Sequence, residues 1–208
     1  MAKSMPLVLK GLGMTLLICA VVIPLGALGG LAAALASVSG NRFLRRGAIA
    51  FVDLFRAIPP LVLLIFIYAG LPFAGMRISP FAAVTLGFFL NNSAYFAEIF
   101  RAGLLSVPKG QAEAARSTGL TRAQTLIWVT LPQAVRNVLP DLLSNMVEIV
   151  KLTSLASVVS LGEILHAAGL VRSLTYNASP LVLAAGIYLL LLWPLIRLIS
   201  HFERRIAS

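Results

Sequence analysis

Two groups of polar side chains interrupt otherwise apolar stretches of this sequence. They comprise Asn91, Asn92, Ser93 and Tyr95 in one stretch, and Asn145, Glu148 and Lys151 in another. Amides, hydroxyls, a carboxylate and an ammonium can together hydrogen-bond to a small polar solute and neutralise charges of either sign. Polar groups in an apolar stretch cost free energy unless they find partners, so these groups either line a polar cavity or hydrogen-bond to neighbouring helices.

The sequence has no residue set with the spacing of a known catalytic or metal site. Residues 70–77 have the glycine spacing of a phosphate-binding loop but lack its Lys and Ser/Thr. His166 and His201 have neither an HExxH arrangement nor a nearby cluster of Cys and carboxylates, so we expect no metal site. A GxSxG nucleophile motif is also missing from the sequence. We therefore expect neither enzyme activity nor a cofactor bound by this chain.

Composition places the chain in a membrane. Of its 208 residues 59% are hydrophobic and 12% charged, and the mean hydropathy is +0.95, far from soluble averages. The 17 Lys and Arg outnumber the 7 Asp and Glu, but they lie between apolar runs and not along one soluble face. That distribution argues against nucleic-acid binding. We expect one membrane domain over residues 1–208.

Four spans follow from runs without charged residues, each reaching the roughly 20 residues that a bilayer core requires. The runs lie between Lys10 and Arg42, between Arg56 and Arg77, over residues 78–97, and between Arg172 and Arg197. The spans that we predict from them cover roughly residues 12–36, 52–72, 78–105 and 177–200. The first run could instead be a signal peptide, but it is about twice the usual length of one. Gly26 and Gly30, four residues apart in that first run, predict close packing against another helix.

A fifth span over residues 125–150 is predicted from periodicity, because charges interrupt its apolar run. Polar residues recur there every three or four positions, which places them in one stripe along a mainly apolar helix. The stripe consists of Asn137, Asp141, Ser144, Asn145, Glu148 and Lys151. Facing lipid would be costly, so the stripe must face protein or a water-filled pathway. The alternative is an amphipathic helix at the membrane surface of a four-span protein.

The basic residues predict which side of the membrane each loop faces. With five spans, twelve of the 17 Lys and Arg lie on one side, and the positive-inside rule puts that side in the cytoplasm. The N-terminus is then outside, the C-terminus is cytoplasmic, and residues 106–124 form the largest cytoplasmic loop. Residues 153–171 look too polar and interrupted to span, so we expect an external re-entrant or interfacial segment.

The stretch KGQAEAARSTGLTRAQTLIWVTLP, residues 109–132, predicts a short helix with sharp ends in that cytoplasmic loop. Pro108 ends the preceding helix, residues 113–116 favour a helix, and Gly119 suits a left-handed C-cap. Alanines let another protein approach closely, while Glu113 offers it a charge. These residues alone fit a docking element and a solvated connecting helix equally well.

The same stretch resembles the EAA loop of the membrane subunits of bacterial ABC importers. It contains the pattern Glu113-Ala114-Ala115, three residues, Gly119, nine residues, then VTLP at residues 129–132. FRAIPPLVLLIFIYAGLP, SAYFAEIFRAGLLSVPKGQAEAA and KLTSLASVV are similar to the polar amino acid permeases of the histidine, glutamine and arginine importer type. The resemblance covers nearly the whole chain, and it implies an all-α, five-helix type I permease in the bacterial inner membrane.

The resemblance also implies partners that this chain does not encode. They are two cytoplasmic ATPase subunits that bind ATP and Mg²⁺, a second permease subunit, either identical or a sister, and an external solute-binding protein. The residues that would couple the permease to its ATPase are Gly110, Glu113, Ala114, Ala115, Gly119, Leu131 and Pro132.

For an amino acid substrate, the seven polar residues named first become a candidate binding site. A zwitterion needs an anion for its ammonium, and a cation, hydroxyls or backbone N–H groups for its carboxylate. We expect Asn91, Asn92, Ser93, Tyr95, Asn145, Glu148 and Lys151 to line the pathway, with a polar pocket near the middle of the membrane. The alternative is that they only hold helices together. A channel not coupled to ATP would also line a pore with polar residues, but it has no need of a compact cytoplasmic helix of this pattern.

Overall fold

The computed structural model describes the backbone of residues 5–207 and the side chains of residues 5–200. Every regular element in that range is helical, as the sequence predicts. The α-helices are α1 Met5–Ser37, α2 Arg42–Ala57, α3 Pro60–Ile65, α4 Pro80–Ser106, α5 Lys109–Ser117, α6 Arg122–Thr125, α7 Leu131–Asn137, α8 Leu139–Leu152, α9 Ile164–Thr175 and α10 Ser179–Ala207. Turns of π- or 3₁₀-helix connect some of them: η1 Phe66–Gly70, η2 Leu71–Ala74, η3 Leu126–Thr130 and η4 Thr153–Val159.

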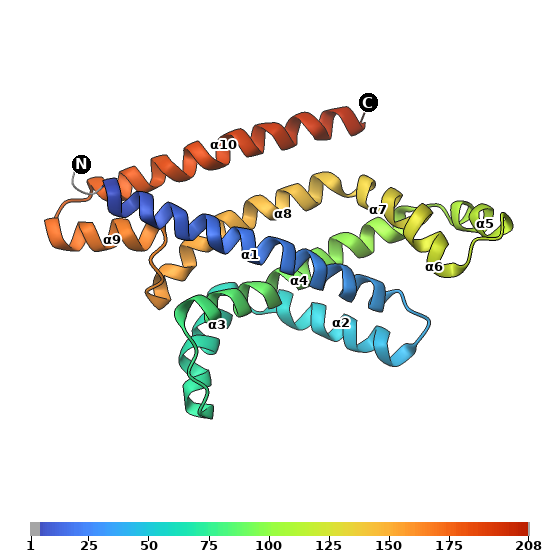
Figure 1. Ribbon diagram of the computed structural model, residues 1–208, viewed down its shortest axis with the longest axis horizontal. Helices are drawn as coiled ribbons and strands as arrows, with labels where there is room; N and C mark the ends of the chain where they lie inside the picture. Colours follow the sequence, from blue (N-terminus) through green and yellow to red (C-terminus); the bar gives the residue numbers. More distant parts are fainter. Residues whose placement is uncertain (1–4, 208) are drawn as a thin grey trace.

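The molecule is elongated, and its two ends are built from different segments. Figure 1 shows the start of α1 together with α9 at one end, and the α1–α2 turn with α5 and α6 at the other. Between the ends, α1, α4, α8 and α10 run lengthwise. The short polar helix α5 therefore lies as far as possible from α9.

Three segments of the described chain are long and apolar enough to cross a membrane by length and composition: α1, Leu139–Val159 and Ser179–Ser200. A fourth is broken, because α2 and Pro60–Ala74 pass the same test only together and are bent by 99°. Helix α4, with 27 residues, is about 40 Å long at 1.5 Å per residue, enough to cross. It is not among these segments, because Asn91, Asn92 and Ser93 lower its hydropathy.

Two of the predicted spans have different boundaries in the structure. The one placed at 52–72 is interrupted at residues 58–59, where Pro59 supplies no N–H and α2 ends. The one placed at 125–150 is divided at Val138, between the continuous helical residues 122–137 and α8, and its long apolar segment is Leu139–Val159. Residues 153–159, predicted not to span, continue α8 as a 3₁₀ helix. Asn137 ends α7, so it is not on the same helix as the rest of the predicted stripe.

Helix α1 packs against α4 through small residues. Gly26 and Gly30 are buried there, and a Cβ atom added to Gly30 would lie 2.4 Å from Cβ of Phe96. Helix α4 approaches α7 equally closely, since a Cβ atom at Gly103 would lie 2.7 Å from the carbonyl oxygen of Ala134. Backbones approach this closely only where no side chain intervenes. The predicted packing role of Gly26 and Gly30 is confirmed.

A buried carboxylate holds α9 against the rest of the bundle. Glu163 is fully buried and caps α9 by accepting hydrogen bonds from the N–H groups of Leu165 and His166, at 2.7 and 2.6 Å. Its carboxylate also accepts a hydrogen bond of 3.1 Å from the hydroxyl of Tyr188 on α10. Burial raises the pKa of Glu163 above its ordinary value, although these three donors oppose the shift.

Candidate functional site

A cavity of about 250 Å³ lies between α4 and α8. Its lining residues are Pro60, Asn91, Asn92, Tyr95, Asn145, Glu148 and Leu152. The structure thus brings together five of the seven predicted pocket residues from two distant parts of the sequence. Drug-sized ligands occupy pockets of roughly 300–1,000 Å³, so this one suits a smaller polar solute.

The double proline after α2 positions Asn91. In a regular helix the carbonyl oxygen of Phe55 would accept a hydrogen bond from the N–H of residue 59, but Pro59 has none. The side-chain amide of Asn91 donates to that carbonyl instead, at 2.9 Å. The amide nitrogen of Asn91 is therefore fixed by α2.

Two buried polar atoms at the cavity make no hydrogen bond to any described residue. They are the side-chain oxygen of Asn91, an acceptor, and the side-chain nitrogen of Asn145, a donor. An unsatisfied buried group costs about 1–3 kcal/mol, and native proteins contain few of them. The neighbouring Asn92 does not share this property, because its amide donates to the carbonyl oxygen of Phe88 at 2.8 Å. An unpartnered acceptor and an unpartnered donor thus belong to two residues that line one cavity, from α4 and α8.

Two predicted pocket residues lie elsewhere. Ser93 is buried on another face of α4, where its hydroxyl oxygen would lie 2.5 Å from a Cβ atom added to Gly29 of α1. Helical geometry explains this, because Ser93 is rotated by about 100° from Asn92 and 200° from Asn91. Lys151 forms an ion pair with Glu148 and lies in a separate cavity beside α10. Neither residue lines the α4–α8 cavity.

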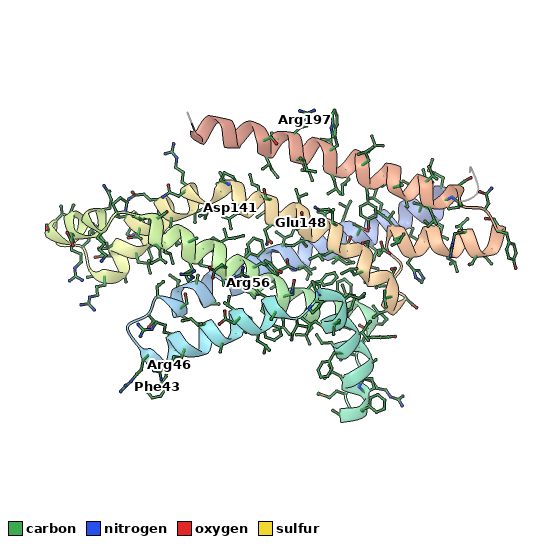
Figure 2. The ribbon with its side chains drawn as sticks, turned by 180° about the vertical axis from the view of Figure 1, so that it is seen from behind. Phe43, Arg46, Arg56, Asp141, Glu148 and Arg197 are labelled. Carbon is green, nitrogen blue, oxygen red and sulfur yellow. The ribbon has the colours of Figure 1, made fainter. Side chains whose placement is uncertain are left out.

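A chain of charged side chains runs from the cavity toward the α1–α2 turn. The guanidinium of Arg56 lies 5.6 Å from the ring centre of Tyr95, and its Nη1 atom lies 3.8 Å from Oε2 of Glu98. Glu98 also pairs with Arg101, one turn further along α4. Figure 2 shows Arg56 where α2 passes close to α4, far from Phe43 and Arg46 at the start of α2. The sequence analysis used Arg56 only as one of the basic residues that predict membrane orientation, and it missed this contact.

The loop residues predicted to couple to an ATPase form a compact, exposed unit. Glu113 and Ala114 are exposed on α5, whereas Ala115 is 8% exposed. Gly119 follows the helix with φ of +92°, the left-handed conformation predicted for it. Gly110 lies in α5 with open space around it.

Leu131 and Pro132, the other two predicted coupling residues, begin α7. The side-chain amide of Gln133 on α7 donates to Gln111 of α5 at 3.4 Å and so connects the two helices. Thr121 and Gln124 form a reciprocal capping box that starts α6 directly after Gly119. The predicted coupling residues therefore belong to one connected unit at the end of the molecule.

Comparison with known proteins identifies the family. Residues 26–208 match the family described as binding-protein-dependent transport system inner membrane component. The chain belongs to this family. It is a permease subunit of an ABC importer and an integral protein of the inner membrane.

The relatives of this permease have similar lengths. It is 37% identical to the probable amino-acid ABC transporter permease YckA of Bacillus subtilis, over 97% of this chain and 88% of that protein. It is 33% identical to the glutamine transport system permease GlnP of Escherichia coli, over 97% and 94% of the two chains.

Solved structures of ABC transporters contain chains with the same fold. The permease superposes with a TM-score of 0.89 on a crystal structure of an amino acid ABC transporter with histidines, at 37% identity over 99% of this chain and 96% of that one. An inward-facing structure of the MetNI methionine ABC transporter shares the fold, with a TM-score of 0.82 at 22% identity over 99% of both chains.

Proposed function

We propose that this permease moves a polar amino acid across the inner membrane, driven by ATP hydrolysis in partner ATPase subunits. The observation that carries the proposal is the α4–α8 cavity, where unpartnered polar atoms of Asn91 and Asn145 lie beside the carboxylate of Glu148. The names of the relatives, which include probable amino-acid and glutamine permeases, support this substrate class.

The cavity offers complementary groups to a zwitterion. The Asn91 oxygen and the Glu148 carboxylate accept hydrogen bonds from an ammonium, and the Asn145 amide donates to a carboxylate. Tyr95 contributes a ring that packs against the solute's apolar atoms. The unsatisfied amide groups disfavour an apolar ligand, because such a ligand would leave them without partners.

For coupling, we propose that α5 seats in a cleft of the ATPase subunit. Exposed Glu113 and Ala114 would face the partner, and buried Ala115 would anchor the helix to its own loop. Small side chains permit close approach, and the carboxylate offers an ion pair. Gly119 lets the chain turn sharply at the end of the helix.

We propose five membrane crossings, with α4 as the third, the N-terminus outside and the C-terminus cytoplasmic. Support comes from the positive-inside rule and from the arrangement in Figure 1, where α5 and the α1–α2 turn share one end and α9 occupies the other. Single cysteines at Lys109 and at Ser173, in a background without the native cysteine, test this by labelling with an impermeant reagent. Labelling of both positions from the same side would contradict the topology.

The transport proposal is tested by reconstitution. The permease would be co-expressed with its cognate ATPase and any sister permease, purified and placed in liposomes with a solute-binding protein. We expect uptake of labelled L-glutamine or L-arginine that needs both ATP and the binding protein. Uptake without ATP would indicate a channel. A purified permease that retains no ATPase subunit would contradict the proposed coupling.

A further inference from the structure

A second, larger cavity of about 520 Å³ lies between the end of α1, α2 and α4. Five charged residues line it: Arg45, Asp53, Arg56, Glu98 and Arg101. In the proposed topology it lies toward the cytoplasmic end, because it reaches Arg45 near the α1–α2 turn. The transport mechanism proposed above makes no use of it.

The polar face of α2 is turned into this cavity. At 100° per residue, Arg45, Asp53 and Arg56 lie within an arc of about 80° on the helix, and exposed Ile49 lies in the same arc. Exposed Phe43 and Leu54 lie about a third of a turn or more from the middle of that arc. The wall of the cavity therefore combines charged side chains with apolar ones, among them Val52 and Leu105.

The charges in the cavity are arranged as a zwitterion requires. Glu98 pairs with both Arg56 and Arg101, so the three together carry one net positive charge. Asp53 makes no ion pair with any residue in the described part of the chain, and neither does Arg45. An unpaired anion and a net positive cluster thus line the same space. An α-amino acid presents the matching pair of charges on one small molecule.

We propose that this cavity is a second, cytoplasm-facing amino acid site through which the accumulated substrate inhibits its own import. The inference rests on the proposed function. The ammonium of the amino acid pairs with Asp53, and its carboxylate pairs with Arg101 and Arg45. The cavity of about 520 Å³ is large enough to hold the whole molecule.

Arg56 connects the two cavities. Its guanidinium packs on the ring of Tyr95, and Tyr95 lines the α4–α8 cavity. When the bound carboxylate pairs with Arg101, Glu98 loses one of its two cations and draws Arg56 toward itself, away from that ring. Occupation of the cytoplasmic site thereby changes one wall of the transport site, as coupling between two sites requires.

The experiment uses the complete transporter in liposomes with the ATPase subunits outward. The binding protein and L-glutamine are enclosed, or L-arginine if that is the amino acid imported. Adding the same amino acid outside exposes only the cytoplasmic face, and binding-protein-stimulated ATP hydrolysis is measured. We expect inhibition, and a half-inhibiting concentration at least tenfold higher for the N-acetylated amino acid, which lacks the ammonium.

Asp53→Asn should remove that tenfold difference, because both ligands then lack the ammonium–carboxylate contact. The comparison of two ligands on one preparation is independent of how much active complex the variant yields. Asp141→Asn is the matched control, since Asp141 is an exposed carboxylate on α8 that lines neither cavity, and it should keep the full difference.

Normal import without inhibition from the cytoplasmic face would overturn this inference and leave the proposed function standing. Equal inhibition by both ligands in the unaltered protein, or the same loss in Asp53→Asn and Asp141→Asn, would also overturn it. Absence of ATP-dependent import in the unaltered transporter would refute the proposed function, and this inference with it.

Discussion

Replacing Gly119 by valine tests whether α5 transmits ATP hydrolysis to the membrane. The residue has φ of +92°, and an added Cβ atom would meet nothing within 4 Å, so the substitution causes strain without a clash. Holding an L-residue in the left-handed region costs about 1–2 kcal/mol, and more for a branched side chain. One to two kcal/mol lowers the population of the sharp turn about 5- to 30-fold. The seated form of α5 should become correspondingly rare.

The assay is binding-protein-stimulated ATP hydrolysis by the reconstituted transporter. We expect Gly119→Val to reach the membrane and bind its binding protein, while stimulation falls at least fivefold. Two glycines supply matched controls with open space around them. Gly40 has no positive φ and lies in the α1–α2 turn, whereas Gly75 has φ of +80° and follows η2. Gly40→Val tests the side chain without strain, and Gly75→Val tests the strain away from α5.

Normal stimulation in Gly119→Val would refute the reasoning and show that the loop is only a connector. If Gly75→Val lost as much stimulation of ATP hydrolysis, the cause would be general destabilisation of the protein and not the turn after α5. Ala115→Trp provides an independent check, because Ala115 is buried and a bulky side chain would displace α5 from its loop. Ala115→Trp should lose the stimulation of ATP hydrolysis by the binding protein, although this substitution places no residue in the left-handed region.

Other substitutions test the remaining contacts. Glu148→Ala should reduce uptake about tenfold or more while the complex still purifies intact, because it removes a carboxylate from the cavity; full uptake with normal affinity would exclude Glu148 from the site. Gly30→Ala should lower stability by about 1–3 kcal/mol, measured by thermal unfolding in detergent, because the added carbon would overlap Phe96. Gly13→Ala, with open space, should not. Stability should fall as pH rises from the unfolded pKa of Glu163 toward its raised folded pKa, since the folded state binds the proton more tightly there. Glu163→Gln should flatten that fall as pH rises above about 4.5, and an unchanged slope would contradict this origin.

Much of the fold was readable from the sequence because its signals are local. The apolar run of α1, the stop at Pro108 and the left-handed Gly119 each follow from a few neighbouring residues, and the structure has all three. The break after α2 was encoded equally locally by Pro59 and Pro60, but the uncharged run around it outweighed that signal. Hydropathy averages over a window and therefore conceals a bend.

The cavity was predictable in part. Helical spacing placed Asn145 and Glu148 on one stripe, and the cost of buried amides drew attention to Asn91 and Asn92. Spacing also argues against Ser93, which lies on another face of α4 from the neighbouring amides. Contacts between distant segments carry no such periodic signal. The position of Arg56 over Tyr95 depends on how α2 crosses α4, which only the three-dimensional structure shows.

The close packing of Gly103 against Ala134 limits how α4 and α7 can move relative to each other. Because the two helices pack this closely at Gly103, we expect the end of α4 and α7 to move together. The next break in the helix along the chain is at Val138, whose φ of −108° and ψ of 13° separate α7 from α8. In the proposed coupling, a displacement of α5 would then rotate α8 against α4 about Val138. Because Asn91 lies on α4 and Asn145 on α8, such a rotation would change the width of the cavity between them.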